Sequence, residues 1–396
     1  MRILFLAPQP FYRERGTCMA TLRLLKALSK LGHVVDVLTY YGGTDVNLEN
    51  VSISRVRTFP FMDDISIGPS KRKFFFDFYF FWAIIGKLIA NRYDIVHAIE
   101  ESAFLAALLK KVFKINLLYD MDSIMSDQMK TSKFAKYKAL VRMVENCERF
   151  AVKNSDVILS VCSSLSESAR AISPQGKIFQ IEDVPMLEES HSPSLDDIER
   201  LKEKYGVTGK RVVMYIGNLE PYQGVDLFLK SIPSVIQRVS DCLFIIVGGL
   251  ASQVKELRNL AGTLGIGQSV IFTGKQPLER IPAFMHIADV LVSPRIQGTN
   301  TPFKIYEYLY SAKPVVATDL PTHTQVLTSE VAFLAGPDPE DFAASIVRSL
   351  TDEALSRKIG EAGAVYVRKN YSQETFFKKV DSLYRYIETT VQKRAH

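Results

Sequence analysis

The chain lacks the residue patterns that several common protein classes require. Its four cysteines, Cys18, Cys147, Cys162 and Cys242, are scattered over 396 residues without a CxxC pair, and no histidine or cysteine cluster has metal-ligand spacing. We therefore expect reduced thiols, no disulfide framework and no zinc site. The pattern GxGxxG after a first strand and the P-loop pattern GxxxxGK are also missing. A nicotinamide dinucleotide site and a P-loop therefore have little support.

Long apolar runs are scarce. The opening run, Ile3 to Ala7, is too short for the core of a signal peptide and is typical of a buried first strand, so we expect a cytoplasmic protein. The stretch from Phe74 to Ala90 would span only about 25 Å as a helix, short of the roughly 30 Å hydrocarbon core, and it contains Asp77 and Lys87. Two interpretations stay open: a packing helix of an α/β domain, or a helix that also rests on an anionic membrane surface.

Positive charge is in modest excess. A formal net charge of +6 is small for this length and gives no argument for nucleic acid binding. Two basic runs stand out: Lys71, Arg72 and Lys73 precede the apolar stretch, and Lys130 to Lys138 (KTSKFAKYK) carries interleaved aromatic residues. In the membrane interpretation these runs contact the inner face of the cell membrane, and in the other they form a solvated rim.

Apolar, strand-like runs alternate with helical patterns along the whole chain. Strands are predicted in the first half at RILFLA, HVVDVLTY, VSISRV, DIVHA, INLLYD, DVILSV and KIFQIED, and in the second half at RVVMYIG, CLFIIVG, SVIFTG, DVLVS, PVVAT and VAFLA. Continuous apolar runs indicate strands buried on both faces, so we predict an α/β protein with two doubly wound, parallel-sheet domains. We place them at residues 1–185 and 210–372, with a linker at 186–209 and a C-terminal helix at 373–396 that packs back towards the first domain.

The segment RIQGTNTPFKIYEYL, residues 295–309, is a candidate anion site. Thr301 suits the N-cap and Pro302 the first helical position, so a helix is predicted to begin at Thr301. Its first turn would present free N–H groups to a ligand, and Gly298 would let that ligand approach closely.

Charged side chains flank this turn. Arg295 and Lys304 are cations on either side of it, and Glu307 would lie near a hydroxyl-bearing part of a phosphate ligand. A sugar nucleotide fits this order of charges. From these residues alone, an ordinary capped helix with solvated charges is the alternative.

Several longer segments resemble a known family. They are Gly16 and Thr17 with LLKALSKLGHVVDVLT, DIVHAIEES, YIGNLEPYQGVDLFLKSI, VIFTGKQPLERIPAFMHIADVLVSPR, KIYEYLYSAKPVVATD and YSQETFFKKVDSLYRYI. Over nearly the whole chain they resemble the retaining glycosyltransferases of family 4, which have the GT-B fold. The resemblance implies two domains facing a cleft and transfer of a hexosyl-type sugar with retention, without metal or cofactor. The donor would be a UDP- or GDP-sugar held mainly by the second domain, and the acceptor a glycan or lipid-linked molecule held by the first.

The resemblance also implies roles for particular residues. Glu307 matches the second glutamate of the family's E-x7-E motif, which binds the donor ribose. The candidate donor-binding residues are Gly16, Thr17, Gly217, Asn218, Gln223, Gly274, Gly298, Thr299, Asn300, Thr301, Pro302 and Glu307. The candidate catalytic residues are Arg295, Lys304, Asp122 and His97.

The second domain departs from the family pattern at three positions. Thr299 replaces the first glutamate of the motif, and Asn218 and Gln223 replace the Arg and Lys that commonly clamp the diphosphate. Losing two charged hydrogen bonds at roughly 1.5 to 3 kcal/mol each would weaken donor binding by about two to four orders of magnitude. Our preferred interpretation is that Arg295 and Lys304 compensate.

The first domain leaves more alternatives open. Asp122 appears where many relatives have a sugar-binding histidine, and it is equally well an ordinary turn residue. His97 resembles a common family histidine, although a histidine at a strand end is often structural. Glu100 or Glu101 could contact the acceptor, and the sequence does not choose between them.

The family chemistry needs no protein nucleophile. In the front-face path the leaving diphosphate itself helps deprotonate the incoming hydroxyl, so the protein supplies charge stabilisation and alignment. The aromatic, basic first half would suit a lipid-linked acceptor in cell-surface polysaccharide or glycolipid synthesis. Two other functions are open: a non-catalytic sugar-nucleotide-binding subunit that supports a partner enzyme, and, less favoured, a sugar-nucleotide epimerase on the same fold.

Overall fold

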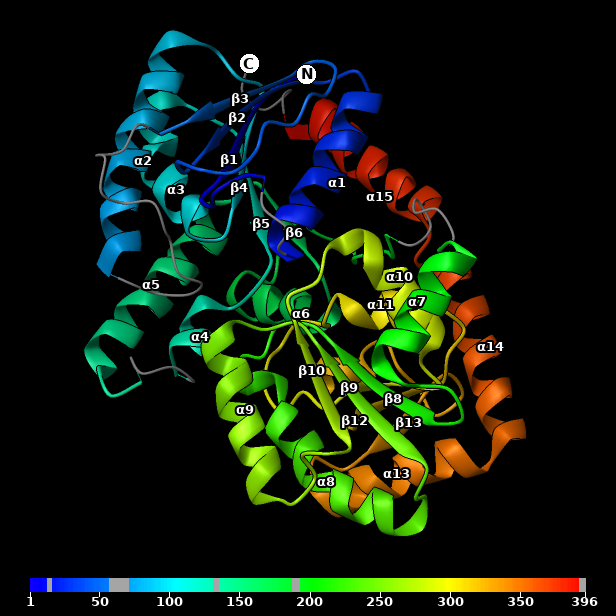
Figure 1. Ribbon diagram of the computed structural model, residues 1–396. Coiled ribbons are helices and arrows are strands. Elements are labelled where there is room, and N and C mark those ends of the chain that lie inside the picture. The colour runs from blue at the N-terminus through cyan, green and yellow to red at the C-terminus, as the bar shows by residue number, and fades with distance from the viewer. Residues whose placement is uncertain (13–15, 57–70, 131–134, 187–192, 392–396) are drawn as a thin grey trace. The chain divides into compact units, whose positions relative to one another are not determined.

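The computed structural model describes residues 1–12, 16–56, 71–130, 135–186 and 193–391 (Figure 1). The chain divides into two compact units. The first comprises Met1–Glu182 together with the chain from Phe376 onward, and the second comprises Asp183–Thr375. Each unit is a parallel sheet covered by helices on both faces.

The first unit is built on a seven-stranded parallel sheet of order β3-β2-β1-β4-β5-β6-β7. Its strands are β1 Arg2–Ala7, β2 Val34–Thr39, β3 Val51–Arg55, β4 Ile95–Ile99, β5 Leu117–Met121, β6 Val157–Ser160 and β7 Ile178–Gln180. Its helices are α1 Gly16–Lys30, α2 Lys71–Ala90, α3 Glu101–Phe113, α4 Met125–Lys130, α5 Lys138–Asn154 and α6 Ser163–Ile172. β1 lies at the centre, where Phe5 pairs with Val37 of β2 and His97 of β4.

Helices cover this sheet on both faces because right-handed crossovers in opposite directions leave on opposite sides. On one face, α2, α3, α5 and α6 contribute to a single apolar core with the strands (Figure 1). Helix α15, Gln373–Tyr386, begins in the second unit and continues in the first, followed by a π-helical turn at Ile387–Val391. It meets α1 through Arg23, whose guanidinium lies 5.8 Å from the ring centroid of Phe376.

The second unit contains a six-stranded parallel sheet of order β10-β9-β8-β11-β12-β13. Its strands are β8 Arg211–Ile216, β9 Cys242–Val247, β10 Val270–Gly274, β11 Val290–Ser293, β12 Val315–Thr318 and β13 Phe333–Ala335. Its helices are α7 Leu195–Tyr205, α8 Val225–Arg238, α9 Ala251–Thr263, α10 Ile281–Ile287, α11 Lys304–Tyr310, α12 Pro321–Thr324, α13 Pro339–Thr351 and α14 Glu353–Asn370, with short 3-10 turns η1 Pro221–Gln223 and η2 Leu278–Arg280. Two apolar cores, one on each face, hold it together.

The structure confirms the predicted fold class and every predicted strand. It differs in the segment predicted as a linker. There, Ser194 caps α7 by accepting a hydrogen bond from the backbone N–H of Asp197, and Gly206 ends the helix in a left-handed conformation. Ile198 and Leu201 are buried in the core of the second unit, so α7 is part of that unit. Residues 187–192 of the predicted linker lie outside the described residues.

Candidate functional site

The sheet topology of the second unit gathers the candidate donor residues at one edge. The strand order reverses between β8 and β11, and the chain leaves these two strands on opposite faces of the sheet. In open parallel sheets, ligands bind outside the carboxyl ends of the strands at such a point. Gly217, Asn218 and Gln223 follow β8, and the loop from Arg295 to Pro302 follows β11. Residues more than seventy positions apart in the sequence therefore meet here.

Lys304 lies at the centre of this edge. Its Nζ donates a 3.1 Å hydrogen bond to Oε1 of Gln223 and lies 3.9 Å from the ring centroid of Tyr215. A Cβ atom at Gly217 would approach that Nζ to 2.7 Å, so a larger residue at this position would displace the side chain of Lys304. Burial, and then the positive charge of Arg295, hold the pKa of Lys304 well below its ordinary value. An anion bound here would raise that pKa, because it would stabilise the charged form.

Arg295 is held within its own loop. It is 7% exposed, its Nε donates to the carbonyl of Gln297 at 2.7 Å, and an Nη donates to Oδ1 of Asn300 at 2.9 Å. Gly298 gives it room, because a Cβ atom there would lie 2.0 Å from the guanidinium and the φ angle of +124° favours glycine. Arg295 therefore shapes the loop and brings its charge close to Lys304.

A buried polar network supports the backbone of the loop after β11. The sequence analysis did not predict this network. His323 is fully buried, with Nε2 2.9 Å from Oγ of Ser293 and Nδ1 2.9 Å from Oγ1 of Thr318. Thr318 in turn donates to the carbonyl of Arg295 at 2.5 Å. Burial lowers the pKa of His323 to about 3, so the imidazole is neutral at physiological pH. In the sequence, the feature that could have indicated this network is the polar run after the predicted strand PVVAT.

Side chains from α12 and its C-cap bind the next part of the same loop. Thr322 donates to the carbonyl of Asn300 at 2.8 Å, and Gln325 donates to the carbonyl of Thr299 at 3.0 Å. Asn300 and Thr299 are partly buried, while Gly298 is exposed. The loop after β11 is thus fixed by side chains that follow β12.

The predicted helix start at Thr301 is wrong. Helix α11 begins at Lys304, its N-cap residue is Phe303, and no side chain caps it. The X-Pro bond after Thr301 disfavours helical backbone there, and Oγ1 of Thr301 is buried without a hydrogen-bond partner. Helix α11 has only seven residues, so its macrodipole is small. The positive charge at this edge therefore comes from the side chains of Arg295 and Lys304.

Glu307 lies one turn into α11 and is 7% exposed. Its Oε1 accepts a 2.5 Å hydrogen bond from the backbone N–H of Met186. The hydroxyl of Tyr308, the next residue, accepts a hydrogen bond from the backbone N–H of Ile216 at 2.8 Å and donates to its carbonyl at 3.2 Å. These contacts attach α11 to the end of β8 and fix the position of the carboxylate.

The remaining candidate donor residues of the second unit form turns at the same edge. Asn218 accepts a hydrogen bond on Oδ1 from the backbone N–H of Glu220 at 3.2 Å, and on its carbonyl from the hydroxyl of Tyr215 at 2.6 Å. The carbonyl of Gly274, at the end of β10, accepts from the backbone N–H of Gly248 at 2.9 Å. Pro302 is buried beside Thr301.

In the first unit, the structure places His97 in the core. The side chain is fully buried, stacks on the ring of Phe5 at 4.3 Å, and uses both ring nitrogens. Nδ1 lies 2.7 Å from the hydroxyl of Tyr384 on α15, and Nε2 lies 2.9 Å from Oδ2 of Asp120 at the end of β5. His97 is therefore held between Tyr384 and Asp120, and its imidazole positions the carboxylate of Asp120.

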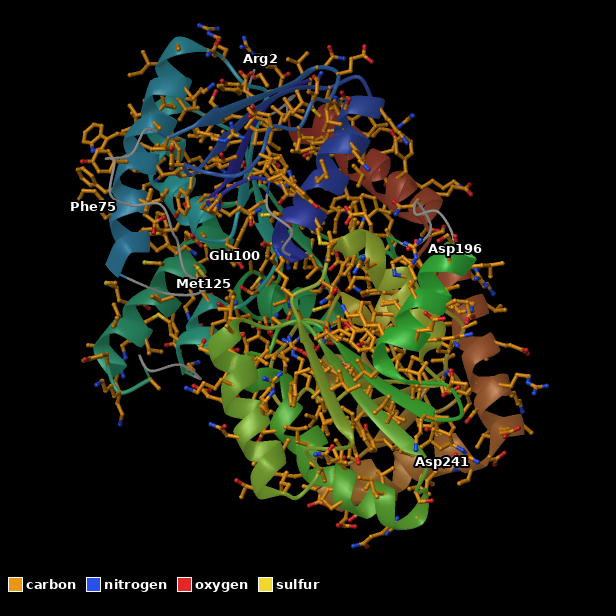
Figure 2. The ribbon with its side chains drawn as sticks, in the orientation of Figure 1. Arg2, Phe75, Glu100, Met125, Asp196 and Asp241 are labelled. Carbon is orange, nitrogen blue, oxygen red and sulfur yellow. The ribbon has the colours of Figure 1, made fainter. Side chains whose placement is uncertain are left out.

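Glu100 and Glu101 belong to a partly buried charged group where β4 meets α3. Glu100, labelled in Figure 2, has a φ of +48°, which is rare for a residue with a side chain and is concentrated at functional sites. Its Oε1 accepts from Ser123 at 2.7 Å, and burial and the neighbouring Glu101 raise its pKa. Lys73 pairs with Oε1 of Glu101 at 2.6 Å.

Asp77 and Tyr40 complete this group. The hydroxyl of Tyr40 donates to Asp77. Burial, reinforced by the charge of Glu101, raises the pKa of Asp77 to about 7. Lys73 is therefore the cation of this acidic group, a pairing that the sequence did not predict, and the side chains of Lys71 and Arg72 lie outside the described part.

Gly16 and Thr17 form the exposed first turn of α1, directly after residues 13–15, which lie outside the described part. Asp122 follows β5 and is partly buried. Among the described residues, no group of three or more His, Cys, Asp or Glu side chains could hold a metal ion. Two cations, a carboxylate and bare glycine backbone at the edge of the second unit together suit a ligand with a phosphate part and a hydroxyl-bearing part.

Two Rossmann-like units, each with a parallel sheet, define the GT-B class of protein. Residues 197–365 match the family model described as Glycosyl transferases group 1, and residues 16–181 match the model described as Glycosyltransferase Family 4. The chain belongs to glycosyltransferase family 4.

Solved structures share the fold along nearly the whole chain. Sucrose-phosphate synthase from Thermosynechococcus elongatus superposes with a TM-score of 0.82 at 20% identity, covering 98% of this chain and 99% of that one. Anabaena HepE in complex with UDP-glucose gives a TM-score of 0.74 at 17% identity, covering 97% and 99%.

A curated relative covers less of the chain. The GDP-mannose-dependent alpha-(1-6)-phosphatidylinositol monomannoside mannosyltransferase of Mycolicibacterium smegmatis is 27% identical over 192 residues, which is 46% of this chain and 50% of that protein. The chain thus spans about half the length of this relative and of two others.

Proposed function

We propose that the protein transfers a hexosyl-type sugar from a UDP- or GDP-sugar bound at the carboxyl edge of the second unit. The observation that carries the proposal is the position of Lys304 beside Gln223. Family members commonly have a cation where this chain has Gln223, and here Nζ of Lys304 lies 3.1 Å from that side chain. Lys304 thus brings positive charge to the place where the diphosphate clamp is missing, which supports compensation.

The chemistry follows from this charge. During transfer, the bond from the anomeric carbon to the diphosphate breaks, a bond to the acceptor oxygen forms, and the hydroxyl proton passes to the leaving phosphate. Lys304 stabilises the developing negative charge, and Arg295 adds to the field from its loop. Because these cations serve the leaving group, the proposed reaction uses no metal ion. Retention at the anomeric carbon follows from attack on the face that the diphosphate leaves.

The donor classes are supported by relatives. One relative is named as GDP-mannose-dependent, and one solved neighbour holds UDP-glucose. In this chain, the carboxylate of Glu307 is fixed by the N–H of Met186 and suits the hydroxyls of the donor ribose. We assign Gly217 and Gly298 to the close approach of backbone to the ligand, since neither position tolerates a Cβ atom without displacing a cation.

The acceptor is assigned to the first unit, at the carboxyl ends of β4 and β5. Glu100, with its positive φ, and Asp122 lie after these strands. Carboxylates hydrogen-bond hydroxyl groups, so a glycan or the sugar part of a lipid-linked acceptor fits them. Such an acceptor would place the protein in cell-surface polysaccharide or glycolipid synthesis.

A second candidate function is a sugar-nucleotide-binding subunit that supports a partner enzyme without turnover. The neutral side chains of Asn218, Gln223 and Thr299 favour it, because charged groups stand at these positions in catalytic relatives. Both candidates predict nucleotide binding, and only the first predicts release of nucleoside diphosphate.

Calorimetry and thermal-shift assays with UDP, GDP, ADP and their sugar conjugates test the donor site. One nucleotide should bind at micromolar strength, and Lys304→Ala and Glu307→Ala should each weaken it. Release of nucleoside diphosphate that is lost in Glu307→Ala would exclude the non-catalytic subunit. If none of the nucleotides binds, the donor site as proposed is wrong.

A further inference from the structure

The outer side of helix α2 is apolar along its whole described length. The large exposed apolar side chains described on it are Phe75, Phe78, Trp82 and Ile89, spaced three, four and seven residues apart. This spacing places them along one side of a helix. Phe78 and Trp82 are each 56% exposed and Ile89 is 73% exposed. Figure 2 shows Phe75 on the outer side of α2, away from the sheet.

This apolar side belongs to a wider surface. Helices α2, α3 and α5 cover the same face of the first sheet and pack side by side (Figure 1). Between α3 and α5, the ring centroids of Phe104 and Phe150 are 5.9 Å apart. Their outward sides add more exposed apolar residues. On α3 these are Leu108 and Val112, and on α5 they are Leu140, Met143 and Phe150. We call the exposed apolar residues of these three helices the apolar face.

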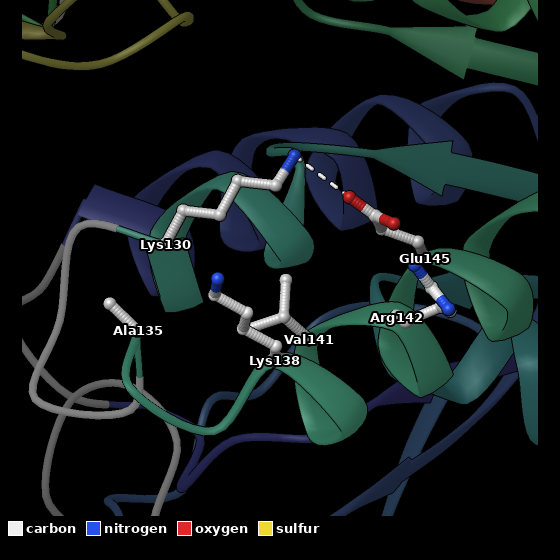
Figure 3. Close-up of a pocket in the computed structure, with 6 residues that line it drawn as sticks. All are labelled: Lys130, Ala135, Lys138, Val141, Arg142 and Glu145. Carbon is white, nitrogen blue, oxygen red and sulfur yellow. Dashed lines mark ion pairs between the residues drawn. The ribbon is translucent and has the colours of Figure 1, made fainter.

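Every exposed charged side chain described on these three helices is basic. They are Lys111 on α3 and Lys138, Arg142, Arg149 and Lys153 on α5. Of the acidic residues of α5, Glu148 is buried, and Glu145, whose side chain is 36% exposed, pairs with Lys130 at 2.9 Å. Figure 3 shows Lys138 and Arg142 around the shallow hollow between the ends of α4 and α5.

We propose that the apolar face of the first unit docks onto the surface of an anionic lipid bilayer. Aromatic and branched apolar side chains beside lysine and arginine are what such a surface favours, because rings insert at the headgroup level while cations meet anionic lipids. A second copy of the chain fits less well. A twofold interface through this face would gather the basic residues of both copies in one contact, where their charges repel.

The proposal goes beyond the proposed transferase activity, since it concerns where the protein works and uses none of the donor residues. It also changes the sequence-based expectation. Lys73 is bound to Glu101 and Lys130 to Glu145, so these members of the two basic runs are paired within the protein. The membrane contact is assigned instead to the aromatic side of α2 and the cations of α5. The structure describes no helix that is long and apolar enough to cross a membrane.

Trp82 makes the proposal directly measurable, because it is the only tryptophan in the chain. Full-length protein is mixed with phosphatidylcholine vesicles that contain or lack phosphatidylglycerol. With anionic vesicles, tryptophan emission should shift to shorter wavelength and be quenched by lipids with brominated acyl chains. High salt should weaken the effect, since it screens the cations.

Matched variants distinguish vesicle binding through the apolar face from nonspecific hydrophobic adsorption. Phe78→Ser and Ile89→Ser keep the tryptophan and should each weaken vesicle binding roughly tenfold, as expected for one large apolar side chain. Val365→Ser on α14, which is 65% exposed, is the control and should change nothing. Arg142→Gln with Arg149→Gln should reduce the preference for anionic vesicles. Circular dichroism melting checks that all variants fold.

Three results would overturn the proposal: no spectral shift with anionic vesicles, vesicle binding without quenching of Trp82, or equal binding to neutral vesicles. Self-association without lipid that Phe78→Ser abolishes would assign the face to a second copy instead. Nucleotide binding, measured on the same variants, should stay unchanged. A failed vesicle experiment is therefore distinguishable from a failed donor site.

Discussion

Replacing Lys304 by methionine should lower nucleoside diphosphate affinity and leave the fold at least as stable. Methionine keeps an unbranched side chain that can pack on the ring of Tyr215, where Nζ of Lys304 now lies 3.9 Å from the centroid. The substitution removes the charge together with the hydrogen bond to Gln223. A charge-assisted hydrogen bond contributes roughly 1.5 to 3 kcal/mol, so affinity should fall by a factor of roughly 10 to 150.

The stability prediction has the opposite sign because the pKa of Lys304 is lowered in the folded protein. Between the folded and the unfolded pKa, the unfolded chain binds more protons, so the free energy of unfolding rises with pH in that window. The buried charge therefore disfavours folding at lower pH, and Lys304→Met should relieve this. The loss of the contact between the cation and the ring opposes the gain by about 0.5 to 2 kcal/mol.

Isothermal titration calorimetry and urea unfolding measure the two effects. Repeating the calorimetry in buffers of different ionisation enthalpy detects protons taken up on binding, which we expect because a bound diphosphate raises the pKa of Lys304. Lys313→Met is a matched control: burial also lowers the pKa of Lys313, but it precedes β12 at the opposite edge of the sheet and donates to the carbonyl of His286. Unchanged nucleotide affinity in Lys304→Met, or a large loss of stability with it, would refute the reasoning.

Three further substitutions test other parts of the structure. Gly298→Ala should weaken nucleotide binding in calorimetry, because its Cβ would lie 2.0 Å from the guanidinium of Arg295 and displace it. Thr318→Val should lower the free energy of unfolding in urea by about 1 to 3 kcal/mol, because the buried carbonyl of Arg295 loses its donor. Asp77→Asn should flatten the pH dependence of stability in the same assay. The pKa of Asp77 is raised to about 7, so wild-type stability falls as pH rises from about 4 towards 7.

Each of these substitutions has a control or a contrary outcome. Gly265→Ala also places a side chain at positive φ, but no atom lies within 4 Å of its Cβ, so it should spare binding. Equal effects of the two glycine changes would mean that backbone strain alone matters. Thr318→Ser restores the hydroxyl and should recover most of the lost stability. If wild type and Asp77→Asn show the same pH profile, the carboxyl is not protonated in the folded protein.

The sequence by itself determined the strands and the class of fold. Runs such as RVVMYIG and CLFIIVG are apolar at every position because both faces of a parallel strand are covered, and this local signal needs no distant information. It also pointed to Lys304 and Glu307, since a basic and an acidic residue three positions apart in the chain lie on one short helix. The predicted helix start failed because cap preferences at Thr301 and Pro302 compete with the extended backbone that proline imposes on its predecessor.

Only the tertiary structure decided which side chains meet. Gln223 and Lys304 come together because β8 and β11 are neighbours in the sheet, and His323 reaches Ser293 because β12 lies beside β11. Burial, too, is a property of the packed molecule: it removes His97 from any exposed surface and lowers the pKa of Lys304. The type of a residue limits the chemistry that it can perform. Its charge state and its neighbours depend on groups that are brought together only when the chain folds.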